Sequence, residues 1–372
     1  MTKPHKQKLI TDLQTQGLRL VDPNAGASGR RGGAGPSDHK AVTIDGTTVM
    51  VPIYTGTASQ SEYQAAVTTA AQGGPHAVDL QHDLQRNGEA VGAIAFPPRP
   101  RFYDFTTDDG TPYWKIALLH SRDVLATTVL QTCMRYRDPR TACQFCAIEQ
   151  SLVENRTVAR KHPEQLAEVA AAAVALDGVK HMVMTTGTPS TPDRGAAHLT
   201  ACALAVKAKV DLPIQAQCEP PDDFSWFGRM KAAGVDSLGM HLEAIDPQVR
   251  AKIMPGKAEI PVSRYFEAFE AAVEVFGWGQ VSTYLLCGLG DSVETIAQTC
   301  DRLIDLGVYP FVVPFVPITG TPLESHPAPE PATMTAVYEA VGAKLRQAGM
   351  SSADMNAGCG KCGACSALSL FE

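Results

Sequence analysis

The pattern of apolar and polar residues becomes regular near residue 125. From there, short runs of β-branched and apolar residues alternate with loops containing Gly, Pro or Cys and with stretches of helical length. This alternation predicts βα repetition and a parallel sheet. The expected strands are Thr127–Thr132, His181–Thr185, Ile214–Cys218, Ser237–Leu242, Gln280–Cys287 and Phe311–Val316.

The segments between these strands predict helices, because their apolar residues recur with helical spacing. This pattern alone fits a barrel and an open doubly wound sheet equally well. Residues suited to chemistry fall at or just after the C-terminal ends of the strands, where barrels carry their active sites. We therefore expect an α/β fold, a partial (βα)6 TIM-like barrel. The expected helices are Glu164–Leu176, Gly195–Ala208, Asp222–Ala233, Val262–Val275, Val293–Leu306 and, last, Ala332–Gln347.

The residues before this repetition have a different composition. Asn24–Ser37 is rich in Gly, Ala, Ser and Arg, and the prolines of Phe96–Arg101 interrupt any regular element. Thr, Val and Ile in Val42–Tyr54 predict β structure around the turn signal Asp45–Gly46. We expect an N-terminal extension with a flexible loop over residues 1–120, a barrel core over 121–328, and a C-terminal helix with a Cys-rich tail over 329–372.

Charge and hydropathy narrow the possible partners. The chain has 32 Lys and Arg against 39 Asp and Glu, a net charge of −7, which argues against binding nucleic acid or an anionic membrane. No apolar run approaches the roughly 18 to 20 residues of a membrane span, and the N-terminus lacks the apolar centre of a signal peptide. We expect a cytoplasmic protein that acts on a small molecule.

Ten cysteines in such a chain favour metal, cluster or catalytic thiols over disulfides. Cys133, Cys143 and Cys146 lie on one loop after the first expected strand. Three thiolates on a [4Fe–4S] cluster leave one iron free to bind another molecule. A zinc site with a remote fourth ligand and unrelated buried thiols are the alternatives.

This cysteine loop resembles that of the radical SAM superfamily, in particular the biotin synthase and lipoyl synthase branch. Phe145 before the last cysteine and the two-residue gap match the branch, whereas the nine-residue gap after Cys133 is longer than its usual three. The resemblance covers about residues 125–325. It implies a barrel that binds S-adenosylmethionine (SAM) at the cluster. The whole chain looks like a biotin-synthase-related bacterial family encoded beside a nitrilase.

Several strand ends carry further parts of the resemblance. Thr186, Gly187 and Thr188 stand where the family binds the methionine amino group through backbone carbonyls, and Gly187 permits a close backbone approach. Alternation places the side chains of Gln217 and Glu219 on one face of the third strand, and those of His241 and Glu243 on one face of the fourth. The resemblance implies that Glu243 holds the ribose or amino group of SAM, with His241 beside it. Arg250 and Lys257 are the two candidates for binding the carboxylate group of SAM, and the resemblance does not decide between them. The predicted cofactor-binding residues are Phe145, Thr186, Gly187, Thr188, Gln217, Glu219, His241 and Glu243.

A second cysteine set closes the sequence. Cys359, Cys362 and Cys365 are each separated by two residues, a spacing common in iron–sulfur proteins. We expect an auxiliary iron–sulfur cluster, with zinc as the alternative. Cys287 is a further candidate ligand, although a core thiol is the simpler interpretation.

The predicted function is that of a radical SAM enzyme. Its [4Fe–4S] cluster cleaves SAM reductively to a 5′-deoxyadenosyl radical, which abstracts hydrogen from a small-molecule substrate for sulfur insertion, rearrangement or oxidation. An electron donor such as flavodoxin or ferredoxin is implied. Arg135, Arg137 and Arg140 are interpreted as solvated loop charges, with a contact to substrate or flavodoxin as the alternative. A non-catalytic iron–sulfur electron carrier and a zinc-dependent barrel enzyme remain the competing classes.

Overall fold

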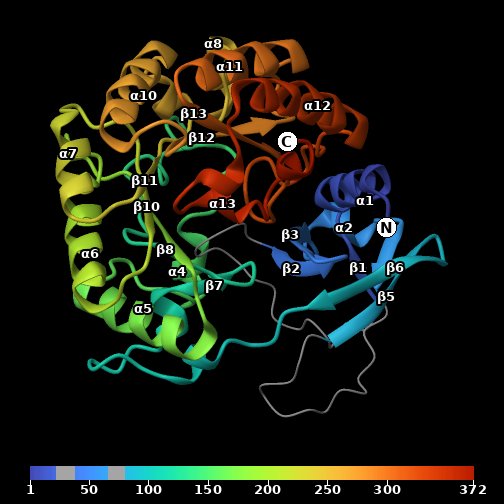
Figure 1. Cartoon of the computed structure of the whole chain (residues 1–372), viewed down its shortest axis with the longest axis horizontal. Coiled ribbons are helices and arrows are strands. Elements are labelled where there is room, and N and C mark those ends of the chain that lie inside the picture. The colour runs from blue at the N-terminus through green and yellow to red at the C-terminus, as the bar shows by residue number, and fades with distance from the viewer. Residues whose placement is uncertain (22–37, 66–79) are drawn as a thin grey trace.

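The computed structural model describes residues 1–21, 38–65 and 80–372, and the predicted flexible loop at Asn24–Ser37 lies outside these residues. The described chain forms two sheets, which lie side by side in Figure 1. Both contribute to the site described below.

The larger sheet has seven strands in the order β13-β12-β11-β10-β9-β8-β7. Strands β8 to β13 pair in parallel, and β7 joins the edge antiparallel to β8. The fold is thus mixed α/β with a curled half-barrel sheet, as expected. The strands are β7 (Leu118–His120), β8 (Val124–Thr128), β9 (His181–Thr185), β10 (Ile214–Gln217), β11 (Ser237–Gly239), β12 (Val281–Cys287) and β13 (Val308–Pro314).

Three of these strands differ from their predicted bounds by two residues or more: β8, β11 and β13, which spans Val308–Pro314 rather than Phe311–Val316. β8 ends at Thr128 rather than Thr132, because the chain turns away and Gln131 N–H bonds the Ala159 carbonyl. β11 ends at Gly239 rather than Leu242. There the Leu242 amide donates to the Thr283 hydroxyl at 2.9 Å instead of to a strand carbonyl. The chain therefore leaves regular pairing where the candidate site begins.

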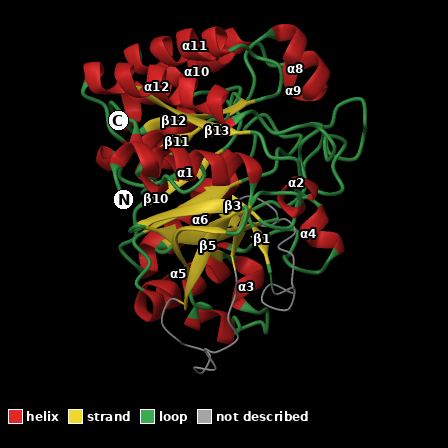
Figure 2. Cartoon of the chain, turned by 90° about the vertical axis from the view of Figure 1, so that its right-hand side faces the viewer, coloured by secondary structure: helices red, strands yellow, loops and turns green. Residues whose placement is uncertain are grey.

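Helices follow the strands and cover the outside of the half-barrel, as Figure 1 shows for α5, α6, α7 and α10. Figure 2 shows α10, α11 and α12 together beside β12 and β13. α7 begins three residues later than expected, because the Asp223 carboxylate accepts from Ser225 N–H and organises the turn before it. The helices are α4 (Gln150–Val153), α5 (Pro163–Asp177), α6 (Ala196–Lys209), α7 (Ser225–Ala232), α8 (Pro247–Ile253), α9 (Pro255–Ala258), α10 (Val262–Phe276), α11 (Val293–Asp305) and α12 (Pro331–Ala348).

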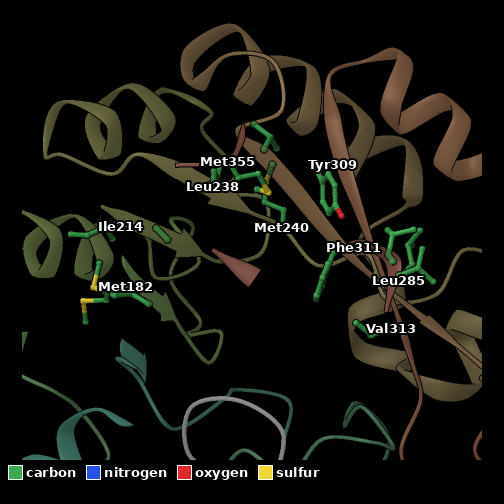
Figure 3. Close-up of a cluster of buried hydrophobic side chains, with 14 of the residues drawn as sticks. Met182, Ile214, Leu238, Met240, Leu285, Tyr309, Phe311, Val313 and Met355 are labelled. Carbon is green, nitrogen blue, oxygen red and sulfur yellow. The ribbon is translucent and has the colours of Figure 1, made fainter. Parts of the chain in front are cut away.

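The main core lies between these helices and the sheet. Figure 3 shows buried side chains from successive strands, including Met182, Ile214, Leu238 and Phe311, joined by Met355 from the C-terminal segment. Burial of such apolar surface is the main stabilising contribution to the fold. Cys287 belongs to this core, in agreement with the simpler interpretation of that thiol.

The N-terminal part contains more structure than its sequence indicates. β2 and β3 form the predicted hairpin, and Asp45 and Gly46 both have positive φ, 47° and 76°, as a tight hairpin turn requires. Helix α1 (Lys3–Gln16) packs on β3 and on α12. The six-stranded sheet, in the order β1-β4-β5-β6-β2-β3, comprises β1 (Arg19–Leu20), β2 (His39–Ile44), β3 (Thr47–Pro52), β4 (Tyr63–Ala65), β5 (Leu80–Arg86) and β6 (Glu89–Phe96), with short helices α2 (Gly56–Ser59) and α3 (Tyr113–Ile116) nearby.

The segment after α12 packs between the two sheets. It contains the short helix α13 (Cys359–Cys362), which Figure 1 places between the half-barrel and strands β2 and β3. The Ala364 carbonyl accepts from Met50 N–H at 2.7 Å, and Cys359 N–H donates to Gln215 Oε1 at 3.1 Å. The second cysteine set is therefore held against both sheets. Within the described residues, no helix combines the length and apolar character needed to span a membrane.

Candidate functional site

The first cysteine set lies on the loop between β8 and α4. Tyr136 N–H bonds the Cys133 carbonyl and Cys146 N–H bonds the Cys143 carbonyl, both at 3.1 Å. The long gap between Cys133 and Cys143 contains a tight turn, in which the Asp138 carbonyl accepts from two later amides. All three cysteines are half-buried.

Helices α8 and α9 hold this loop in place. Gln144 N–H bonds the Ile253 carbonyl at 2.8 Å, and Gly256 N–H bonds the Thr141 carbonyl at 3.1 Å. A Cβ added to Gly256 would lie only 2.6 Å from that Thr141 oxygen. The unusually long loop is thus accommodated by a glycine that lets α9 approach its backbone.

The predicted segment Thr186–Thr188 braces the same loop from the other side. A Cβ on Gly187 would lie 2.2 Å from the Thr132 carbonyl oxygen, so the close approach at this glycine is to the cysteine loop itself. The Thr188 carbonyl accepts from Met134 N–H at 2.9 Å. These residues adjoin the cysteines but do not line the cavity described below.

Two buried ion pairs lie beside the loop. Arg135 donates to Glu219 at 2.6 Å, with only 7% and 9% of the side chains exposed, and Lys257 donates to Glu243 at 2.8 Å. Burial alone would lower the pKa of Lys257, but Glu243 and neighbouring anionic groups raise it overall. The interpretation of Arg135 as a solvated charge is wrong, because the side chain is enclosed with its carboxylate partner.

The other arginines of the loop fit their interpretation as solvated charges. The Arg137 and Arg140 side chains are 80% and 88% exposed, and they pair with Glu149 and Asp138. Arg135 is therefore a functional candidate for which the sequence favoured the wrong one of two interpretations. Its position two residues after Cys133 was the only available signal.

Arg250, proposed as a partner of the SAM carboxylate, has another role. Its guanidinium donates to the carbonyls of Leu242, Ala244 and Ile260 at 2.9 Å, and to that of Lys257 at 3.3 Å. These bonds tie the end of β11 to α9 and α10. The Arg250 side chain is thus committed to backbone structure.

His241 and Glu243 lie where β11 leaves regular pairing. Glu243 has a φ of 67°, an uncommon conformation for a non-glycine residue that often marks a functional site. The His241 ring lies 4.5 Å from that of Tyr284, and its Nε2 atom is buried without a hydrogen-bond partner among the described residues. Burial, together with the positive charge of Lys257, lowers the pKa of His241 to about 3, so its imidazole is neutral at ordinary pH.

A cavity of about 360 Å³ connects this region with the second cysteine set. Phe145 of the first cysteine loop lines it, and Cys359, Cys362 and Cys365 line it as well. Of the predicted cofactor-binding residues, Phe145, Gln217, His241 and Glu243 line the cavity, whereas Glu219 and Thr186–Thr188 do not. Its apolar wall includes Ala126, Val183, Leu286, Val313, Phe315, Val316 and Ile318.

The second cysteine set is surrounded by polar groups. Gln217 Nε2 donates to Cys359 Sγ at 3.2 Å, and Tyr284 hydrogen-bonds the same sulfur. Gln217 therefore contacts the C-terminal thiols, although its sequence position suggested a SAM contact. Burial raises the pKa of the Cys362 thiol to about 12, and that of Cys359 also lies above its ordinary value.

The donor chemistry of both sets suits iron–sulfur binding, since each supplies three thiols. In the residues that the structure describes, no three His, Cys, Asp or Glu side chains are already arranged around a common metal position. A [4Fe–4S] cluster binds each thiolate through a different iron, so it does not require the thiols to converge on one metal position. Glu219 Oε2 and His241 Nε2, both buried and without partners in the described chain, are further atoms that a bound molecule would satisfy.

Part of the chain that contains this site matches a known family. Residues 136–303 match the family described as the radical SAM superfamily, a range that includes Cys143 and Cys146 and begins just after Cys133. Less than half of the chain thus matches this family, and the matching part is similar to a radical SAM domain.

Individual relatives match only parts of the chain. Bacteriochlorophyllide c C-7(1)-hydroxylase of Chlorobaculum limnaeum is 34% identical over 121 residues, which cover 32% of this chain and 30% of that protein. Lipoyl synthase of Marinobacter nauticus is 27% identical over 172 residues, 45% of this chain and 47% of that protein. The chain thus spans less than half the length of either curated relative. The crystal structure of methylornithine synthase (PylB) is similar with a TM-score of 0.45 and 18% identity, over 58% of this chain and 61% of that one.

Proposed function

We propose that this protein is a radical SAM enzyme in which Cys133, Cys143 and Cys146 hold a [4Fe–4S] cluster that binds SAM. When bound, the cluster and SAM supply reductive cleavage of the SAM C5′–S bond and hydrogen abstraction from a small-molecule substrate. The observation that carries the proposal is the meeting of the cysteine loop with two buried ion pairs, one of which, Lys257–Glu243, borders the cavity through Glu243. Neither a purely structural zinc site nor an electron carrier needs such a polar pocket beside its thiols.

The ion pair next to the cysteines suits the amino acid part of SAM. Arg135 bonds Glu219 through one carboxylate oxygen, while Glu219 Oε2 is buried without a partner in the described chain. The guanidinium can donate hydrogen bonds to a second carboxylate, and Glu219 Oε2 can accept a hydrogen bond from an ammonium group. We assign Arg135, rather than Arg250 or Lys257, as the carboxylate partner.

The remaining cofactor contacts follow the geometry of the strand ends. Glu243 and the neutral His241 would accept or donate hydrogen bonds at the ribose and adenine side, and Phe145 would pack against the cofactor. Thr186, Gly187 and Thr188 keep their proposed role through the backbone beside the cluster loop. The apolar cavity wall would exclude water from the reacting substrate.

The proposal also includes the division of the chain into a barrel and two flanking parts. Six parallel strands with outer helices are consistent with a partial (βα)6 barrel over residues 121–328, an N-terminal part over 1–120 and a C-terminal helix with its cysteine segment over 329–372. β7 lies before the first boundary but pairs with β8, so the N-terminal part supplies the barrel's edge strand.

We propose that Cys359, Cys362 and Cys365 hold an auxiliary iron–sulfur cluster. They line the same cavity that reaches Phe145, so a substrate there would lie between the two cysteine sets. All ten cysteines are among the described residues and none forms a disulfide, which favours a reducing compartment such as the cytoplasm. A flavodoxin or ferredoxin would supply the electron.

The decisive experiment is an assay of 5′-deoxyadenosine formation after anaerobic reconstitution with iron and sulfide. Wild-type protein, SAM and dithionite should yield the nucleoside, and the C133A/C143A/C146A variant should yield none. C300A, which removes a buried thiol in α11 remote from the cavity, is the matched control and should retain activity. Wild-type protein with verified clusters and no nucleoside would leave the electron carrier standing, while bound zinc without iron would favour a zinc enzyme.

A further inference from the structure

The turn between β7 and β8 contacts the C-terminal cysteines at two consecutive residues. His120 Nε2 lies 3.6 Å from Cys365 Sγ, and the Ser121 hydroxyl hydrogen-bonds Cys362. Both residues are buried, with 7% exposure each. The N-terminal part of the chain thus reaches the cysteine set that lies at the far end of the sequence.

The position of His120 is fixed by its surroundings. It ends β7 and pairs with Val124 of β8, so its backbone is part of the larger sheet. Ser121, next in the turn, has a φ of 58°. His120 also lines the cavity together with all three cysteines, so the four side chains border the same space.

His120 lies beside the cysteine set, with its Nε2 atom at hydrogen-bond distance, 3.6 Å, from Cys365 Sγ. On a [4Fe–4S] cluster each ligand binds a different iron, so the ligand atoms lie farther apart than those of a single ion. Rotation of the two side chains away from each other would bring the imidazole to the iron that the three thiols leave free.

We propose that His120 is the fourth ligand of a metal site formed with Cys359, Cys362 and Cys365. This inference rests on the proposed auxiliary site and specifies its coordination. Four protein ligands leave no open iron for substrate, so the cluster passes electrons rather than binding the substrate. The polar contacts of Gln217 and Tyr284 to Cys359 then serve as hydrogen bonds to a ligating sulfur, which tune a cluster's potential.

The test isolates the C-terminal site in the full-length chain. The C133A/C143A/C146A background removes the first cluster, and the protein is reconstituted with iron and sulfide and labelled with ¹⁵N-histidine. We expect about four irons per chain and, in pulsed electron paramagnetic resonance of the reduced cluster, a nitrogen coupling of the size of a directly bound imidazole.

Variants at the turn provide the comparison. H120A should lose the nitrogen coupling and most of the iron, whereas H120C should retain the iron with a fourth thiolate in place of the imidazole. R122A, at an exposed position of the same turn, should keep both iron and coupling. Circular dichroism of each variant shows whether the fold is intact.

The outcomes separate this inference from the auxiliary cluster. A cluster without a bound histidine nitrogen would overturn the role of His120 and leave the auxiliary cluster standing. Bound zinc, with three sulfurs and one nitrogen by X-ray absorption, would support His120 as a ligand and overturn the iron–sulfur assignment. A background variant that binds neither metal would overturn both.

Discussion

Lys161 is a buried cation beneath the first cysteine loop. Its ammonium donates to Thr157 Oγ1 at 2.6 Å, to Gln131 Oε1 at 3.0 Å and to the Val158 carbonyl at 3.1 Å. Gln131 in turn donates to the Ile148 carbonyl and so joins the two ends of the cysteine loop. Lys161 therefore stabilises the base of the loop through three hydrogen bonds.

The first prediction concerns the pH dependence of stability. Burial lowers the pKa of Lys161 from 10.5 to about 7, so between these values the unfolded chain binds more protons than the folded one. The free energy of unfolding contributed by Lys161 should therefore rise with pH in this window, by up to about 1.4 kcal/mol per pH unit. Denaturant unfolding of wild type and K161M at pH 7.5 and 8.5 measures it.

The two proteins must be compared as a difference, because other titrating groups then cancel. The stability of wild type relative to K161M should increase between the two pH values. An unchanged difference would show that Lys161 has the same protonation in the folded and unfolded chains.

Sequence reasoning named the cysteines and the carboxylates Glu219 and Glu243, but it did not predict the ion pairs that these carboxylates form. Cys133, Cys143 and Cys146 share one loop and are visible as a local motif. Arg135 and Arg137 look alike in the sequence, and only the fold encloses one of them with Glu219 and exposes the other. Their difference arises from contacts between distant segments, which local patterns do not contain.

Among the elements, the segment carrying the second cysteine set depends on a glycine. Gly358 has a φ of 115°, and a Cβ there would lie 2.2 Å from the Gln215 side chain. Gln215 accepts from Cys359 N–H, so the glycine brings the first cysteine of the set against β10. Both the backbone conformation and the packing exclude a side chain at this position.

The second prediction is that G358A disrupts this segment. We expect it to lower the free energy of unfolding by at least about 1 kcal/mol more than G349A, and to reduce metal at the C-terminal site. Gly349 is the matched control, since its φ of 64° is also positive but a Cβ there would meet no atom within 4 Å. Thermal unfolding and metal analysis report the two effects, and equal losses in both variants would contradict the packing argument.

The sequence predicted helix bounds accurately where apolar residues kept helical spacing over several turns. The helix from Val293 is strongly amphipathic, with Ile296, Cys300 and Leu303 on its buried face, and its bounds agree to within one residue. In the N-terminal sheet the sequence predicted only the β2–β3 hairpin. Strands β5 and β6, of seven and eight residues, were not predicted, and β1 and β4 have only two and three residues. Such strands are defined by their partners rather than by a local pattern.

At the scale of the whole molecule, the C-terminal segment joins the two sheets. Gln14 Nε2 of α1 and Met50 N–H of β3 both donate to the Ala364 carbonyl, at 3.0 and 2.7 Å. Gln7 of α1 donates to the Leu370 carbonyl at 2.9 Å. The position of the second cysteine set relative to the half-barrel thus depends on the N-terminal part.

The third prediction tests this dependence. Q14M removes one hydrogen bond to Ala364 at similar volume, so the free energy of unfolding should fall by about 1 kcal/mol. A chelator should also remove iron faster from the C-terminal site of the C133A/C143A/C146A background. Q298A, at an exposed position of α11 where the side chain bonds only Glu294, should change neither quantity.

The contact between Gln14 and Ala364 also bears on how the protein is made. These residues are 350 positions apart, so the contact cannot form while a ribosome is still adding the middle of the chain. The cysteines at 133–146 leave the ribosome long before Cys359, Cys362 and Cys365 do. The second set can therefore receive metal only when synthesis is nearly complete, whereas the first set leaves the ribosome much earlier.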